Sequence, residues 1–331
     1  MKLIKIMLSV IALLAVGTGC ANKNDVKVAE RKNTPNSMLE LSREDEMLWD
    51  TCSKHFNAEK CNDLGVSFQR GDGVKQSYKR AVDCYELACD KNYALACRNA
   101  GSLYFQRYNH KIDEDLWQGD PEEFFQKACN LDDAAGCNDL GIVYESGLEF
   151  KNLPPDFKKA NAYYEKACNM GNSSGCSNRG FLYANGYGVK QDYKKANTYY
   201  DKACNMNSGT GCFNLGVAYE QGYGVKQDYK KANTYYEKSC TLNNSDGCLN
   251  SGVFYGNGKG VKQNYGLANI YYEKACNLNN GGGCNNLGVL YAKGQGVVQS
   301  KTTAKGYYRK ACDLGEQLGC NNYRGLNEQD Y

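Results

Sequence analysis

Two kinds of amphipathic segment alternate along most of the chain. In residues 228–240, Tyr229, Ala232, Tyr236 and Cys240 recur at i, i+3, i+7 and i+11, which places an apolar stripe on one face of a helix. Lysines and a glutamate occupy the opposite face, which we interpret as solvated. The preceding segment, 213–219, is also rich in apolar residues. The pattern predicts a pair of helices packed through their apolar faces.

Glycines and capping residues mark where these helices end and begin. Gly222 and Gly224 follow the first segment and suit a left-handed helix terminus with a tight turn. The same Gly-x-Gly recurs at Gly71 and Gly73, Gly186 and Gly188, Gly258 and Gly260, and Gly294 and Gly296. Asp228 then precedes the second segment as a good N-cap. Its counterparts are Ser77, Asp156, Asp192, Asn264 and Ser300.

Cysteine pairs repeat at the boundary between one helix pair and the next. Seven pairs hold two cysteines eight positions apart, and one pair is a residue longer. From Cys168 to Cys312 the first cysteine of each pair recurs with a period of 36 residues. A fixed period of this length indicates a repeat array rather than a globular core. The pairs are Cys52 and Cys61, Cys89 and Cys97, Cys129 and Cys137, Cys168 and Cys176, Cys204 and Cys212, Cys240 and Cys248, Cys276 and Cys284, and Cys312 and Cys320.

The spacing within a pair requires the chain to reverse if the sulfurs are bonded. On one continuous helix Cys204 and Cys212 would lie about 12 Å apart, whereas a disulfide needs Cα atoms within about 7 Å. Asn205, Asn207 and Gly209 lie between them and favour a turn. We therefore favour a disulfide across a helix–turn–helix corner. Metal binding is the alternative, although the spacing and the two histidines fit zinc poorly.

The N-terminus indicates export. Residues 1–19 carry Lys2 and Lys5 before a short apolar run, which is typical of a signal peptide. Small residues then precede Cys20, as in the lipobox of bacterial lipoproteins, although Gly17 stands where a leucine is usual. We favour lipidation of Cys20 over simple cleavage that leaves a free thiol. The expected location is the periplasm or the outer membrane, with secretion as the alternative and a lipid anchor as the one membrane contact.

The remaining divisions follow from the repeats. Residues 20–37 are polar and predict a flexible tether, 38–60 a half-repeat cap, 61–319 seven helix pairs, and 320–331 a C-terminal cap. Cys84 has no partner and stands at a helical packing position, so we expect a buried, inert thiol. The net charge of +3 falls to about +1 without the leader lysines, and no basic block appears. Nucleic-acid binding is therefore not expected.

The repeat unit resembles the Sel-like repeat (SLR) family, relatives of tetratricopeptide repeats. Residues Asn214, Leu215, Gly216, Tyr219 and Ala232 are among those that carry the resemblance within 212–240. The cysteine pair in each unit is similar to that of the Helicobacter cysteine-rich proteins. The resemblance implies an all-α fold, a right-handed α/α superhelical solenoid with one disulfide per repeat. It further implies a scaffold for protein partners, and some such proteins are described as β-lactamases or penicillin binders.

The residues themselves do not indicate an enzyme. No serine begins an S-x-x-K sequence, S-D-N is absent, and the only histidines are His55 and His110. We therefore predict no catalytic residue, no metal site and no cofactor. The irregular connection 106–119 and the longer loop at 148–155 are places where function or tolerated insertion is equally expected.

A series of asparagines is the candidate binding site. One asparagine follows the second cysteine by two positions in six units, and Asp63 and Asp139 interrupt the series. In a concave groove such amides could hold an extended peptide backbone. Alternatively, each could bond to a neighbouring repeat and only fix the stacking. The series is Asn99, Asn178, Asn214, Asn250, Asn286 and Asn322.

Three functions remain open at this point. The first is an exported monomeric scaffold that binds a protein or peptide in its groove. The second is a protein that binds β-lactams weakly or hydrolyses them. The third is a structural envelope lipoprotein in contact with peptidoglycan fragments.

Overall fold

A computed structural model describes residues 52, 57–110, 119–148 and 154–328. The signal peptide, Cys20, the tether, His55 and most of the predicted half-repeat cap lie outside the described residues. Residues 111–118 of the irregular connection and 149–153 of the long loop do so as well. The chain divides into two compact units, Met1–Phe124 and Phe125–Tyr331, which are described separately.

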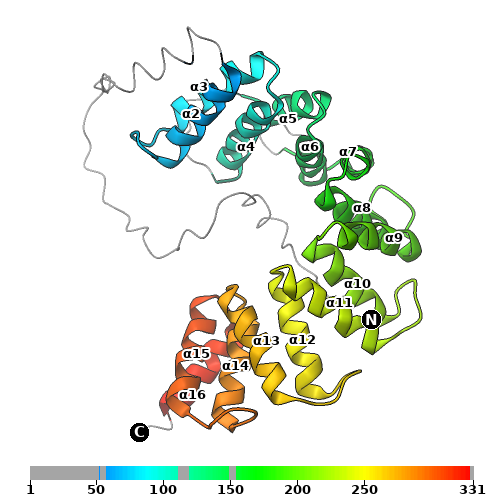
Figure 1. Cartoon of the computed structure of the whole chain (residues 1–331), viewed down its shortest axis with the longest axis vertical. Coiled ribbons are helices and arrows are strands. Elements are labelled where there is room, and N and C mark those ends of the chain that lie inside the picture. Colours follow the sequence, from blue (N-terminus) through cyan, green and yellow to red (C-terminus); the bar gives the residue numbers. More distant parts are fainter. Residues whose placement is uncertain (1–51, 53–56, 111–118, 149–153, 329–331) are drawn as a thin grey trace. The chain divides into compact units, whose positions relative to one another are not determined.

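Fifteen helices follow one another through the described residues (Figure 1). Most are thirteen residues long, so the array is built from nearly identical rods. In the second unit each odd-numbered helix from α7 onward packs against the even-numbered helix before it, as predicted for a solenoid of helix pairs. The helices are α2 (Ala58–Arg70), α3 (Tyr78–Asp90), α4 (Ala94–His110), α5 (Pro121–Asn130), α6 (Ala134–Ser146), α7 (Phe157–Asn169), α8 (Ser173–Asn185), α9 (Tyr193–Asn205), α10 (Gly209–Gln221), α11 (Tyr229–Thr241), α12 (Ser245–Asn257), α13 (Tyr265–Asn277), α14 (Gly281–Lys293), α15 (Lys301–Asp313) and α16 (Gln317–Glu328).

The predicted helix ends are confirmed. The Asp228 carboxylate accepts a hydrogen bond from the backbone N–H of Lys231, and the side chains at the five counterpart positions cap their helices in the same way. Gly222 ends α10 with φ 76°, and Gly224 follows with φ 68°. Both angles lie in the left-handed region that favours glycine. These residues therefore fix helix length independently of the packing.

Each corner between a second helix and the next first helix carries a cysteine pair at bonding distance. At Cys204 and Cys212 the Cα atoms are 4.6 Å apart, and all eight pairs fall between 4.5 and 4.9 Å. Asn207 reverses the chain at φ 60°, and the Ser208 hydroxyl then caps α10 by accepting from Gly211 N–H. The bridges therefore join successive helix pairs rather than the two helices of one pair.

The partners in these bridges are the ones that the spacing of the cysteines predicts, and the fold carries one disulfide per repeat. The metal-binding alternative does not apply to sulfurs that are bonded to each other. The structure pairs Cys52 with Cys61, Cys89 with Cys97, Cys129 with Cys137, Cys168 with Cys176, Cys204 with Cys212, Cys240 with Cys248, Cys276 with Cys284 and Cys312 with Cys320.

Glycines permit the close approach of the helices. A Cβ placed on Gly211 would lie 2.6 Å from the Cβ of Ala203 across the corner. A Cβ on Gly216 would lie 2.5 Å from ring carbons of Tyr236, which is fully buried. Glycine costs about 1 kcal/mol relative to alanine inside a helix. The packing of the tyrosine ring against the bare backbone compensates for that cost.

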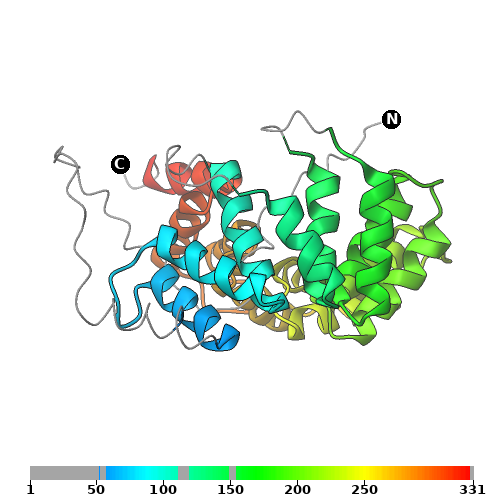
Figure 2. The same ribbon diagram turned by 90° about the horizontal axis from the view of Figure 1, so that it is seen from above.

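The first helices lie on the inner side of the stack in the second unit. The first helices α8, α10, α12, α14 and α16 contact one another in succession, whereas the second helices make no contacts of comparable extent. A stack whose layers approach more closely on one side curves toward that side. Figures 1 and 2 show these helices following one another from green to red.

Two further observations complete the fold. Cys84 is fully buried on α3, as expected, and burial with a smaller effect of Asp83 raises the pKa of its thiol to about 12. Such a thiol is not a nucleophile at neutral pH. Within the ranges described, no helix combines the length and the apolar character that crossing a bilayer requires.

Replacing Gly216 with alanine should lower the free energy of unfolding by about 1–3 kcal/mol, because the methyl group would displace Tyr236. The control is Gly306→Ala on α15, where nothing lies within 4 Å of the added Cβ. That substitution should raise stability by up to about 1 kcal/mol through helix propensity. Thermal and urea unfolding would measure both. Equal effects of the two substitutions would contradict the packing role of Gly216.

Candidate interaction surfaces

Three of the candidate asparagines bond to the neighbouring repeat. Asn178 donates to the side-chain oxygen of Asn138 at 3.0 Å, and Asn322 donates to Asn285 at 2.8 Å. In the first unit Asn99 donates to Asn62 at 2.8 Å. The alternative role, in which the amide fixes the stacking of repeats, therefore holds at these three positions.

The accepting amide is itself oriented by the next residue. Asn138 donates to Asp139 at 3.3 Å, and Asn62 donates to Asp63 at 3.4 Å. The two aspartates that interrupt the asparagine series thus take part in the same stacking contact. This contact needs an asparagine at the first position after the second cysteine, a requirement that the sequence pattern alone did not reveal.

The central asparagines lack this amide partner because the sequence changes. Ser177, Phe213 and Leu249 stand where the partner amide would be for Asn214, Asn250 and Asn286. Asn250 and Asn286 turn to the hydroxyls of Tyr236 and Tyr272 in the preceding repeats. Among the described residues the side-chain amide of Asn214 has no hydrogen-bond partner. It is half-buried on the inner helix α10.

A file of half-buried apolar residues runs beside the asparagines. Each lies three residues after the asparagine position, and a spacing of three places both side chains on the same helix face. Phe213 and Leu249, also half-buried, adjoin the file in the centre. The inner face thus offers amides and apolar groups side by side along α6 to α14. The members of the file are Ile142, Phe181, Val217, Val253 and Val289.

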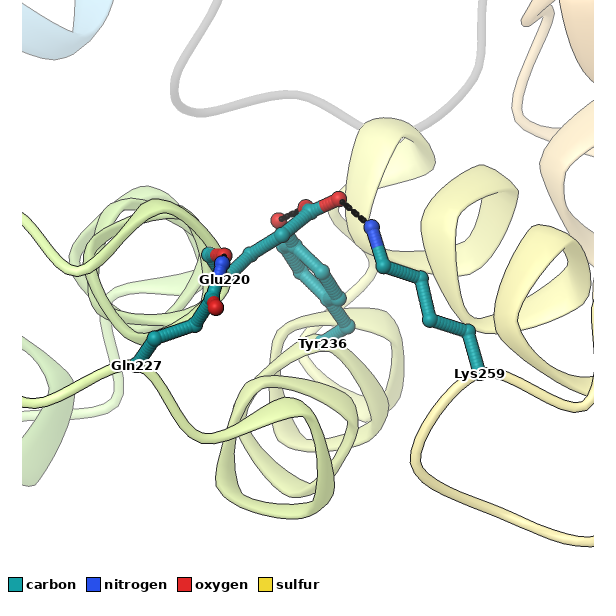
Figure 3. A network of polar contacts seen from close by, with 4 residues as sticks. All are labelled: Glu220, Gln227, Tyr236 and Lys259. Carbon is teal, nitrogen blue, oxygen red and sulfur yellow. Dashed lines mark hydrogen bonds and ion pairs between the residues drawn. The ribbon is translucent and has the colours of Figure 1, made fainter.

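A polar network connects two successive repeats on the same unit (Figure 3). The Glu220 carboxylate accepts from the Tyr236 hydroxyl at 2.5 Å and pairs with the Lys259 ammonium at 2.7 Å. Gln227 donates to the backbone oxygen of Glu220 at 2.7 Å. The Lys259 ammonium also lies 4.5 Å from the ring centroid of Tyr229. Lys259, which lies in a Gly-x-Gly loop, thus links its repeat to the preceding repeat through an ion pair.

Burial is the main cause of most of the shifted pKa values. Burial, followed by the hydrogen bond and charge of Glu220, raises the pKa of Tyr236 far above its ordinary value. Burial likewise raises the pKa of the Glu145 carboxyl, which the Tyr164 hydroxyl partly opposes. In the parts of the chain that are described, no group of three or more His, Cys, Asp or Glu side chains could hold a metal ion.

The helix pairs correspond to a known repeat. The Sel1 repeat pattern matches residues 61–93, 134–172, 173–208, 210–244, 245–280 and 282–316. The chain belongs to the Sel1 repeat family. The repeats matched in sequence coincide with the helix pairs of the structure, and a Sel1 repeat scaffold fits a role in protein–protein interaction.

Two solved Sel1 repeat structures share the fold. A Sel1 repeat protein from Oxalobacter formigenes covers 85% of this chain and 80% of its own, with a TM-score of 0.71 and 21% identity. The Escherichia coli protective antigen c5321 covers 85% of this chain and 58% of its own, with a TM-score of 0.65 and 24% identity. Helicobacter pylori cysteine rich protein B is 42% identical over 41% of this chain and 98% of its own, with a TM-score of 0.34.

The curated proteins that match this chain share the same name. Cytochrome c oxidase assembly factor 7 of Xenopus tropicalis is 36% identical over 114 residues, which is 33% of this chain and 47% of that protein. The protein of the same name from Mus musculus is 29% identical over 105 residues, 29% of this chain and 43% of its own. The chain thus spans less than half the length of the curated relatives it matches.

Replacing Asn178 with alanine should lower the free energy of unfolding by about 1–2 kcal/mol, because the side-chain oxygen of buried Asn138 would lose its donor. Asn214→Ala is the matched control, since that amide has no partner among the described residues. It should leave the urea midpoint nearly unchanged. A loss of stability at Asn214 equal to that at Asn178 would show that both amides serve the stacking.

Proposed function

We propose that this protein is an exported Sel1 repeat scaffold that binds an extended segment of a protein partner along its inner helices. The observation that carries the proposal is the central part of the second unit, where Asn214, unpartnered among the described residues, has an unused amide beside the apolar file. At Asn178 and Asn322, nearer the two ends of the unit, the corresponding amide donates to an asparagine of the neighbouring repeat. At Asn250 and Asn286 the amide bonds to a tyrosine hydroxyl of the preceding repeat, so within the described series Asn214 is the amide that stays open to a ligand.

The chemistry of this stretch suits an extended polypeptide. A backbone in extended conformation presents N–H and C=O groups, and a primary amide can both donate to and accept from it. Val217 and Val253, half-buried in the apolar file, can contact alternate side chains of the same segment. Recognition of this kind depends little on partner sequence, and its specificity would come from the apolar contacts.

Export is supported by the cysteines. All sixteen cysteines of the pairs lie at bonding distance, and disulfides persist in oxidising compartments such as the periplasm. The leader and the lipidation of Cys20 are parts of the same proposal. In it, a lipid on Cys20 holds the repeat array near a membrane surface by way of the polar tether.

The names of the relatives agree with a scaffold. The curated relatives are assembly factors for cytochrome c oxidase, a designation that describes work on other proteins rather than catalysis. We extend to this chain only the general feature, namely that its partners are proteins. No residue pattern of the described chain adds support for β-lactam hydrolysis.

A photo-crosslinking residue in place of Val217 should capture a protein partner from cell-envelope extract, because position 217 lies beside Asn214 on the inner face. The same residue in place of exposed Thr234 on α11 is the control and should capture little. Asn214→Ala should reduce capture at position 217 by about tenfold, which corresponds to the free energy of roughly one hydrogen bond. Equal capture at positions 217 and 234, or capture unaffected by Asn214→Ala, would exclude the inner face.

Cys20→Ser should move the mature protein from the membrane fraction to the soluble fraction, since the thiol that would carry the lipid is absent. Mass spectrometry of the N-terminus should find a lipid mass on the wild-type chain and none on the variant. A wild-type N-terminus without lipid would contradict the tether. It would leave the crosslinking result unaffected.

A further inference from the structure

The Gly-x-Gly loops form a continuous edge along the second unit. Each loop packs on the first residue of the second helix in the preceding repeat, where Gly224 leaves no room for a Cβ against Tyr193. Gly188 meets Phe157 and Gly260 meets Tyr229 in the same way. The loops and first helical turns of successive repeats therefore adjoin one another. We name this surface the lysine edge and define it as residues 154–159, 186–195, 222–231 and 258–267.

The lysine edge is strongly basic. It contains ten lysines and three aspartates, a formal charge of +7, although the whole chain carries only +3. Nine of the lysines are exposed, and within the described residues none of these nine forms an ion pair. The aspartates Asp156, Asp192 and Asp228 are half-buried helix caps that accept from backbone N–H groups. The exposed lysines are Lys158, Lys159, Lys190, Lys194, Lys195, Lys226, Lys230, Lys231 and Lys262.

Six of these lysines, in pairs on α7, α9 and α11, occupy the first turn of a helix, where they are unfavourable for the fold. Lys194 and Lys195 occupy the first turn of α9, and Lys230 and Lys231 that of α11, where the positive end of the helix dipole repels cations. The second lysine of each pair lies over a tyrosine ring, at 5.4 Å for Lys195 over Tyr183. Because the first lysine of each pair has no such contact, its position is not explained by stability.

Aromatic rings lie between the charges. Tyr187 stacks on Phe157 at 5.0 Å, and Tyr223 stacks on Tyr193 at 4.9 Å between ring centroids. Both loop tyrosines are 42% exposed, which is high for so large a side chain. Rigid, half-exposed tyrosines are frequent anchors in protein interfaces. The edge thus alternates fixed rings with long, solvated cations.

A pocket lies at one end of the edge. Its lining includes Tyr144, Phe157, Lys158 and Lys159, together with Pro154 and Pro155. The Lys159 ammonium lies 4.7 Å from the Tyr144 ring centroid beside it. Asp156 also lines the pocket, and its carboxylate accepts from the backbone N–H groups of Lys158 and Lys159 as the cap of α7. With that carboxylate engaged in the cap, the apolar walls and the two lysines fit a side chain that is apolar along its length and anionic at its tip.

From these observations we propose that the lysine edge binds an acidic polypeptide segment of a partner protein. Carboxylates spaced along an extended chain complement lysines that recur in four successive repeats, and the tyrosines contact the chain between them. A bilayer fits less well, because the exposed rings are stacked on the protein and cannot insert. Duplex DNA fits less well, because the edge lacks the arginines that read and clamp phosphates bidentately. The lysine edge is separate from the inner face. The proposal for the lysine edge therefore does not depend on the function proposed for the inner face.

The test uses the full chain and a fluorescent peptide of about 20 residues rich in glutamate, with anisotropy as the readout at about 0.05 M and 0.2 M salt. Lys194→Gln with Lys230→Gln should weaken binding by about tenfold at the lower salt concentration. The control removes the same charge from the opposite ends of the same helices, as Lys202→Gln with Lys238→Gln, and should change binding less than about twofold. Asn214→Ala is measured beside these variants to test whether the peptide binds at the inner face instead.

Each other outcome overturns the proposal. Equal weakening by the two lysine double variants would show attraction to net charge alone. Binding to vesicles of anionic phospholipid or to duplex DNA, with none to the glutamate peptide, would assign the edge to a different class of partner. Loss of peptide binding in Asn214→Ala would move the site to the inner face. Circular dichroism of each variant separates these outcomes from unfolding.

Discussion

The close contact between a second helix and the next first helix is the constraint on which the array depends. At the six corners of the second unit a glycine removes the side chain that would hold the helices apart, as Gly211 does against Ala203. The cysteines are then brought within reach of each other, and the bond joins one repeat to the next. In a repeat array the interface between neighbours supplies much of the stability. Here that interface is covalent, whereas the two helices of one repeat are held by packing and by hydrogen bonds such as that from Tyr236 to Glu220.

The difference between the contacts within a repeat and those between repeats explains which residue types recur in each unit. Inside a repeat the bare backbone at Gly216 receives the Tyr236 ring, and the Gly-x-Gly turn sets the distance between the helices. Between repeats the cystine fixes the corner, and the inner asparagines or a network such as that of Glu220 and Lys259 align the rest. With the stacking so well determined, individual positions can be released for binding. The amide of Asn214 and the lysines of the lysine edge are the positions that we propose to have this role.

Much of the fold could be predicted from the sequence because its signals are local. A capping residue such as Asp228, the glycines after each first helix and the cysteine spacing each act within a few residues, and the structure confirms them. The inner surface could not be predicted in the same way. Whether an asparagine bonds to its neighbour depends on a residue about 37 to 40 positions away, as in Asn178 and Asn138. The charge of the lysine edge is also not apparent from the sequence. Each repeat contributes only two or three lysines, and the stacking of the repeats brings them together on one surface.

The short span of each bridge has a consequence for how the molecule is made. Every paired cysteine finds its partner eight or nine residues away, while the next bridge begins at least 28 residues on. Closing so small a loop costs little entropy, so proximity selects the correct partner as the chain emerges. Oxidation can then proceed from one end to the other without reshuffling. An ancestral gene could gain or lose a whole unit by duplication or deletion, and no existing bridge would need a new partner.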